Sequence, residues 1–184
     1  MSGGSATDRP VRDTGIVVLG VGNMLAGDDG VGVHVISRLG EPGAPALPSG
    51  TRVLDGGTLG LELLAVLHDA RALVVVDAVD VGASPGTVRL LSGPEVEAAL
   101  AHSMSAHQIG VADLLALAQL TEILPAKVSM VGVQPDQVGL SLELSPRVRA
   151  ALPDAVEAVR RVTWAYAETL GAPGSVARTR SGGT

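Results

Sequence analysis

The chain of 184 residues has no cysteine and no phenylalanine, and it has only one tryptophan and one tyrosine. The lack of cysteine excludes disulfides, thiolate nucleophiles and thiolate metal sites, so cysteine proteases and zinc ribbons are ruled out. Hydrophobic residues still make up 46% of the chain, which is enough for a core. That core must therefore be packed from valine, leucine, isoleucine and alanine in one compact domain.

Basic clusters and long apolar runs are also missing. Thirteen basic residues against nineteen acidic ones give a formal net charge of −6. Because nucleic-acid binding requires a basic surface that displaces counterions, we expect no nucleic-acid partner. No apolar run reaches the roughly 20 residues that cross a bilayer, and no signal peptide is visible. The sequence therefore predicts a soluble, cytoplasmic protein with no membrane partner.

The ends of the chain differ from its middle. Residues 1–14 and 172–184 are rich in Gly, Ser, Thr, Pro and Arg and lack apolar periodicity, which predicts flexible tails. Residues 15–171 contain no internal repeat and are expected to form the single domain.

Short β-branched runs alternate with segments of helical periodicity in this domain, which predicts an α/β fold of three layers. Because helices separate most of the strands, the five-stranded sheet should be mostly parallel, with helices on both faces. A short connection at 82–86 predicts an antiparallel neighbour and hence a mixed sheet. The expected strands are 15–20, 51–54, 72–77, 87–91 and 127–133, and the expected helices are 30–39, 59–67, 107–120 and 153–170, the last with Pro153 in its first turn.

A glycine-rich segment, Gly20 to Gly32, follows the first predicted strand directly. It opens like a dinucleotide-binding fingerprint, but Leu25 stands where that motif requires a glycine. Asp28 and Asp29 precede the next helix, where they would repel a pyrophosphate. Either carboxylate could cap that helix, and only one is needed to do so.

Two further polar residues lie where a sheet of this kind binds ligands, beyond the carboxyl ends of its strands. Asp77 ends a buried strand, so it must either accept hydrogen bonds from loop amides or face a site. His107 opens a predicted helix, whose dipole favours the neutral ring that binds metal. Two carboxylates and one imidazole at this edge predict a three-ligand site for a divalent transition metal, with positions left open for substrate.

Other residues with catalytic chemistry are expected to be structural. Residues 82–86 match G-x-S-x-G around Ser84, but a nucleophile elbow leads from a strand into a helix, and the next segment here is a predicted strand. Ser84 is therefore expected in a turn. His34 and His68 fall within or at the end of predicted helices and are expected to be structural, whereas His102 lies close enough to His107 in the sequence to be a reserve metal ligand.

Five segments in this order and spacing resemble the nickel-iron hydrogenase maturation endopeptidases. That family removes a C-terminal extension from the hydrogenase large subunit once nickel has been inserted. No single segment is decisive, but the five together are highly specific. They are 18–23 with 28–32, then 54–58, 76–78, 106–110 and 131–135.

The resemblance implies a mixed five-stranded sheet and a metal site formed by an acidic residue of the first loop, the Asp after the third strand and the His of H-Q-x-G. By position these are Asp29, Asp77 and His107, which would serve as both metal-binding and catalytic residues. Some members have Glu in place of Asp29. The implied metal is nickel supplied by the substrate, and Zn²⁺ or Cd²⁺ could occupy the site in vitro.

The same resemblance sets the expected partner, a hydrogenase large-subunit precursor, with the chain acting as a monomer. Residues around the three ligands are expected to contact the substrate, namely Asp55, Gly56, Gly57 and Gln108. Without a cysteine or a serine triad, the remaining route is hydrolysis by water, activated by a metal or by a carboxylate base. The alternative is a non-catalytic metal- or nucleotide-binding α/β module.

Overall fold

Five strands form one mixed sheet in the order β2-β1-β3-β5-β4. The computed structural model describes residues 15–57, 63–101 and 111–171, so both predicted tails and parts of two predicted helices lie outside it. Neighbouring strands are parallel except β4, which runs antiparallel to β5, and this confirms the predicted mixed sheet. The strands are β1 (Ile16–Val21), β2 (Arg52–Gly57), β3 (Ala72–Ala78), β4 (Val88–Ser92) and β5 (Lys127–Val133).

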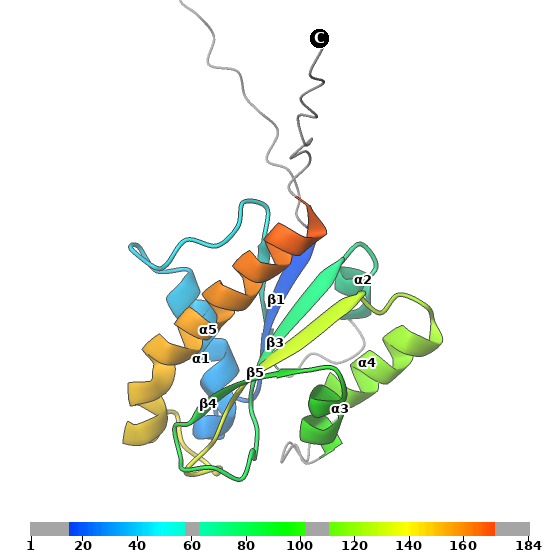
Figure 1. Ribbon diagram of the computed structural model, residues 1–184. Coiled ribbons are helices and arrows are strands. Elements are labelled where there is room, and N and C mark those ends of the chain that lie inside the picture. The colour runs from blue at the N-terminus through cyan, green and yellow to red at the C-terminus, as the bar shows by residue number, and fades with distance from the viewer. Residues whose placement is uncertain (1–14, 58–62, 102–110, 172–184) are drawn as a thin grey trace, which may run out of the picture.

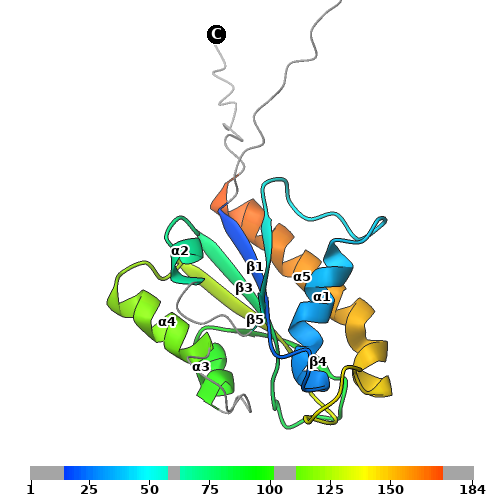
Figure 2. The ribbon, with the colours of Figure 1, turned by 180° about the vertical axis from the view of Figure 1, so that it is seen from behind.

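Helices cover both faces of this sheet (Figures 1 and 2). On one face lie α1 (Val31–Leu39) and α5 (Pro146–Leu170), and on the other lie α2 (Leu64–Leu67), α3 (Pro94–Ala101) and α4 (Val111–Leu120). Alternate side chains of β3 enter the two cores, Val74 and Val76 on the α1 and α5 side, Leu73 and Val75 on the other. No helix among the described residues is long and apolar enough to cross a membrane.

The position of β4 corrects one expectation. The short connection after β3 predicted that β3 and β4 would be neighbours, but β5 lies between them. The connection crosses the end of β5 and is hydrogen-bonded to it. The N–H of Val79 donates to the carbonyl of Val133 at 3.0 Å, and the N–H of Gly86 donates to that of Gln134 at 2.8 Å. These bonds allow a short connection to pass over one strand.

Ser84 lies in an exposed turn of this connection, as predicted. Its carbonyl accepts hydrogen bonds from the N–H of Thr87 at 3.0 Å and from the Thr87 Oγ1 at 2.6 Å. The chain then enters β4 and not a helix, so the geometry of a nucleophile elbow is not present at Ser84.

The last helix begins earlier than predicted, at Pro146 and not at Pro153. Ser145 is its N-cap and accepts a hydrogen bond from the N–H of Val148 at 3.4 Å. Pro153 lies inside the helix, where its ring removes one backbone hydrogen bond. Buried residues before the proline, including Val148 and Leu152, pack against the sheet and outweigh that loss.

Candidate active site

The loop after β1 can turn tightly because glycines occupy the positions where two segments of the backbone are in close contact. Gly22 has a φ of +120°, and a Cβ there would lie 1.9 Å from the carbonyl oxygen of Asp29. In the first turn of α1, a Cβ on Gly32 would lie 2.2 Å from the carbonyl oxygen of Val76. The chain's own backbone therefore fills the space beside these glycines, which argues against a nucleotide phosphate there.

Asp28 is only 1% exposed, and its hydrogen bonds connect the loop after β1 to the loop before α5. Its Oδ2 accepts hydrogen bonds from the backbone N–H groups of Asp136 and Gln137, both at 2.9 Å. Its Oδ1 accepts one from the N–H of Ser145 at 2.7 Å. Burial works to raise the pKa of Asp28, but these donors outweigh it and hold that pKa below its ordinary value. Asp28 is thus an ionised structural carboxylate.

Asp29 is also buried, at 7% exposure, and its Oδ2 accepts a hydrogen bond from the N–H of Asn23 at 2.8 Å. Neither Asp28 nor Asp29 caps α1, so the expected capping role is wrong. The reason is the short 3₁₀ turn η1 (Asp28–Gly30), which precedes the helix and makes Gly30 its N-cap.

Asp77 lies at the end of β3 and is 3% exposed. Its Oδ1 accepts a hydrogen bond from the N–H of the next residue, Ala78, at 2.8 Å. Burial and, to a smaller extent, the charge of Asp29 raise the pKa of Asp77 to about 7, against the opposing effect of the Ala78 N–H. The 3₁₀ turn η1, which holds Asp29, packs against β3, which holds Asp77, and the charge of Asp29 is one cause of the raised pKa at Asp77.

The third expected ligand, His107, lies outside the described residues, as do Gln108 and His102. Within the described ranges, no group of three His, Cys, Asp or Glu side chains is placed to hold a metal. The structure therefore describes two members of the expected set, one from η1 and one from β3.

Asp55, Gly56 and Gly57 lie at the end of β2, beside the end of β1. Asp55 is exposed, and its Oδ1 accepts a hydrogen bond from the N–H of Gly57 at 2.8 Å. The carbonyl of Gly57 accepts one from the N–H of Gly22 at 3.0 Å. The expected substrate-contacting residues of β2 thus adjoin the glycine-rich loop.

Two positioning residues were not singled out by sequence reasoning, although both stand in the segments that carry the resemblance. Asn23 donates its N–H to Asp29, and its own Oδ1 accepts from the N–H of Leu25 at 2.9 Å. Gln134 follows β5, and its Oε1 accepts from the N–H groups of Val81 at 2.8 Å and Ala83 at 3.3 Å. A polar side chain at or just beyond the carboxyl end of a strand was the available signal for both.

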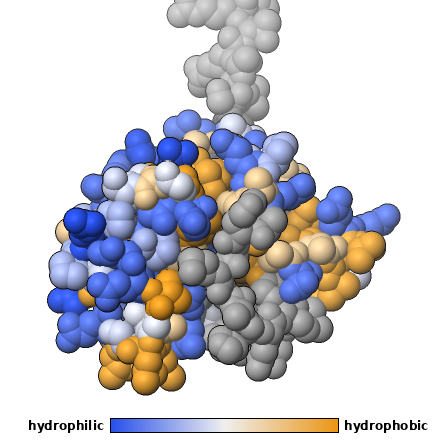
Figure 3. All heavy atoms as spheres, turned by 90° about the horizontal axis from the view of Figure 1, so that it is seen from below, coloured by the Kyte–Doolittle hydropathy of each residue, from blue (hydrophilic) through white to orange (hydrophobic). Residues whose placement is uncertain are grey.

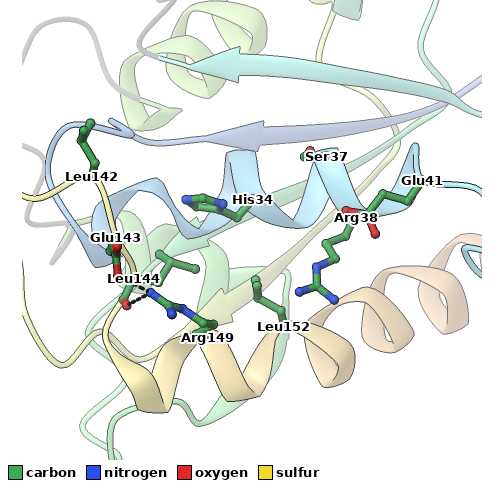
Figure 4. Close-up of a pocket in the computed structure, with 9 residues that line it drawn as sticks. All are labelled: His34, Ser37, Arg38, Glu41, Leu142, Glu143, Leu144, Arg149 and Leu152. Carbon is green, nitrogen blue, oxygen red and sulfur yellow. Dashed lines mark hydrogen bonds and ion pairs between the residues drawn. The ribbon is translucent and has the colours of Figure 1, made fainter.

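A separate cavity of about 270 Å³ lies between α1 and the start of α5 (Figure 4). Its walls include His34, Arg38 and Arg149, together with Glu41 and Glu143. Burial lowers the pKa of His34, and the charges of Arg149 and Arg38 lower it further. Positive and negative side chains are balanced here and neither Asp29 nor Asp77 lines the cavity, so we do not assign it to the active site.

Comparison with known proteins shows which family the chain belongs to. A family model described as hydrogenase maturation protease matches residues 33–162. The hydrogenase expression/formation protein HupD of Rhodobacter capsulatus is 42% identical over 161 residues, covering 85% of this chain and 76% of HupD. The hydrogenase 2 maturation protease of Escherichia coli K12 is 38% identical over 145 residues, covering 78% of this chain and 87% of that protein.

Solved structures agree with the sequence relatives. The hydrogenase maturating endopeptidase HybD from E. coli superposes with a TM-score of 0.72 at 37% identity, over 80% of this chain and 90% of HybD. The hydrogenase maturation protease HybD from Thermococcus kodakarensis gives a TM-score of 0.66 at 32% identity, over 80% and 98% of the two chains. The chain therefore belongs to the hydrogenase maturation protease family.

Proposed function

We propose that this protein removes the C-terminal extension of a nickel-iron hydrogenase large-subunit precursor after nickel insertion, and that it recognises the nickel which the precursor carries. The observation that supports this most is the pair of buried carboxylates, Asp29 and Asp77, at the carboxyl edge of the sheet. Relatives with this fold are named for hydrogenase maturation, which supports the substrate class.

The donor chemistry of the pair fits a divalent cation. Two buried carboxylates repel each other, which is costly in a free protein, and a cation between them would neutralise that repulsion. Carboxylate and imidazole ligands suit a first-row transition metal. With His107, the chain would supply three ligands and leave positions for those of the precursor. All three come from one chain, so a monomer suffices.

The carboxylates would also take part in hydrolysis. By holding the nickel of the precursor, Asp29, Asp77 and His107 would fix the tail beside the site, so that proximity lowers the barrier. A water molecule then attacks the scissile carbonyl carbon and the C–N bond breaks. A carboxylate oxygen of the pair that does not bind the nickel can accept the proton of that water and pass it to the leaving amine.

The test compares a nickel-loaded precursor with the same precursor prepared without nickel. Each is incubated with the wild-type protein, and its mass is followed over time. We expect the nickel-loaded precursor to lose the mass of its C-terminal extension and the nickel-free one to stay intact. Equal cleavage of both would contradict nickel recognition and leave a sequence-specific endopeptidase, whereas cleavage of neither would contradict the proposed activity.

A further inference from the structure

Two loops that are far apart in the sequence are joined into one unit beside the candidate site. The first is the 23–29 loop after β1, and the second is the 136–145 loop before α5. The N–H of Gly27 donates to the carbonyl of Ser141 at 2.9 Å, and the N–H of Ser141 donates to that of Leu25 at 3.0 Å. Together with the bonds to Asp28, these contacts fix the second loop against the first.

This pair of loops carries large hydrophobic side chains that face solvent. Leu140 is 98% exposed, Leu142 is 72% exposed and Leu25 is 57% exposed. Met24 and Val138 are exposed in the same two loops, and we call these five residues the apolar loop surface. The other exposed large hydrophobic residues of the described ranges, Leu90, Leu120 and Trp164, lie on three separate elements.

Exposed apolar side chains gathered in one place mark an interaction surface more often than scattered ones do. Figure 3 looks onto the carboxyl edge of the sheet, where patches of hydrophobic surface lie among hydrophilic residues. These side chains belong to neither hydrophobic core, although backbone hydrogen bonds hold their loops in place. A partner would therefore meet a surface that is already ordered, which lowers the entropic cost of binding.

The location of the surface indicates the partner. Leu25 lies four residues before Asp29 in the same loop, and Asp28, between them, binds the second loop directly. A protein that presents a group to Asp29 would therefore lie beside the loop that carries Met24 and Leu25. Leu142 also lines the cavity between α1 and α5 described above. The charges of that cavity are balanced, so it favours neither an acidic nor a basic partner (Figure 4).

We propose that the apolar loop surface docks the hydrogenase large-subunit precursor through an apolar face beside its cleavage region. The inference rests on the proposed function, because the precursor is the partner which that function supplies. Leu140 and Leu142 would then be specificity-determining residues that bind the body of the precursor, while Asp29 and Asp77 act on its nickel and its tail.

The test uses the full chain with Leu140→Ser and Leu142→Ser combined. A matched control is Leu120→Ser, since Leu120 is 81% exposed at the end of α4, outside the two loops. Binding of nickel-loaded precursor to immobilised protein is measured first, and initial cleavage rates against precursor concentration second. We expect the double variant to bind at least about tenfold more weakly and to raise KM with little change in kcat, as for loss of interface anchors.

The two measurements separate the two proposals. Wild-type affinity and KM in the double variant would overturn the docking surface and leave the proposed function intact. Binding that weakens only in the double variant, without cleavage by any protein, would support the docking surface and contradict the proposed function. An equal loss of binding in Leu120→Ser would also overturn the inference, because the effect would then not belong to the two loops.

Discussion

Asp28 and Asp29 are neighbours in the sequence and both are buried, yet their surroundings differ. Asp28 accepts hydrogen bonds from three backbone N–H groups of the 136–145 loop, and its pKa is held low. Asp29 lies close enough to Asp77 for its charge to contribute to raising that residue's pKa to about 7. The first carboxylate stabilises the fold, whereas the charge of the second disfavours the ionised form of another buried carboxyl, Asp77.

The difference shows how a buried charge can be recognised as structural or functional. A carboxylate surrounded by N–H donors is satisfied by the protein itself, so it needs nothing further. Two carboxylates placed together repel each other even where each accepts a hydrogen bond, and such pairs occur where a cation or a proton transfer is part of the function. Asp77 falls in this second class, together with Asp29.

The largest expected effect is on cleavage. Asp77→Asn should reduce cleavage of the nickel-loaded precursor to background, because it removes a charged ligand at almost constant shape. Asp80→Asn is the matched control, since Asp80 is an exposed carboxylate three residues further along the chain. Precursor mass and circular dichroism are measured for both. Near-normal cleavage by the folded Asp77→Asn protein would remove Asp77 from the site.

Replacement of a glycine beside Asp29 should have a large effect on stability. Gly22→Ala should lower the free energy of unfolding by about 4 kcal/mol, because its Cβ would meet the Asp29 carbonyl in a left-handed backbone conformation. Gly139→Ala is the control, since a Cβ there would meet nothing within 4 Å. Urea titrations measure both, and equal stability of the two variants would show that the loop adapts to a side chain at Gly22.

The carboxylate pair also predicts how stability depends on pH. The raised pKa of Asp77 means that the native state holds its proton more tightly than the unfolded state does. This stabilisation is complete below about pH 4 and is lost as pH rises through about 7. Between pH 5 and 8, the free energy of unfolding of the wild type should therefore fall by roughly 2–3 kcal/mol relative to that of Asp77→Asn. Urea titrations with a metal chelator present measure this difference. A constant difference across that range would show that Asp77 titrates normally.

The smallest expected effect is at Ser84. Ser84→Ala should cleave precursor within about twofold of the wild-type rate, because Ser84 contributes its carbonyl to a turn and its side chain is exposed. The same cleavage assay measures it. A loss of several orders of magnitude in a folded protein would restore the serine-nucleophile hypothesis.

Local patterns were sufficient to predict much of the fold. The apolar runs at β3 and β5, bounded by aspartate and proline respectively, predicted these strands closely, and strands alternating with helices predicted the three layers. Pro153 misled the prediction of α5, because burial of the residues before it depends on contacts with the sheet that no local pattern shows. The place of β5 between β3 and β4 is likewise a long-range property.

The site could be predicted only in outline. The rule that ligands bind beyond the carboxyl ends of strands singled out Asp77. It could not show that Asp28 is structural while Asp29 belongs to the candidate site. That division depends on the 136–145 loop, more than a hundred residues away, whose N–H groups reach one of the two carboxylates. The contribution of Gln134 depends in the same way on hydrogen bonds to residues that are distant in the sequence.

The most direct measurement compares Asp28→Asn with Asp29→Asn, each examined by thermal melting at pH 8 and by cleavage of nickel-loaded precursor. An Asn side chain can accept hydrogen bonds through only one oxygen. Asp28→Asn should therefore lower the free energy of unfolding by about 3 kcal/mol, or Tm by roughly 10 °C. Asp29→Asn should melt at or above the wild-type temperature, since it relieves repulsion with Asp77, and it should fail to cleave. A stable, inactive Asp28→Asn beside an unstable or active Asp29→Asn would contradict this division of roles.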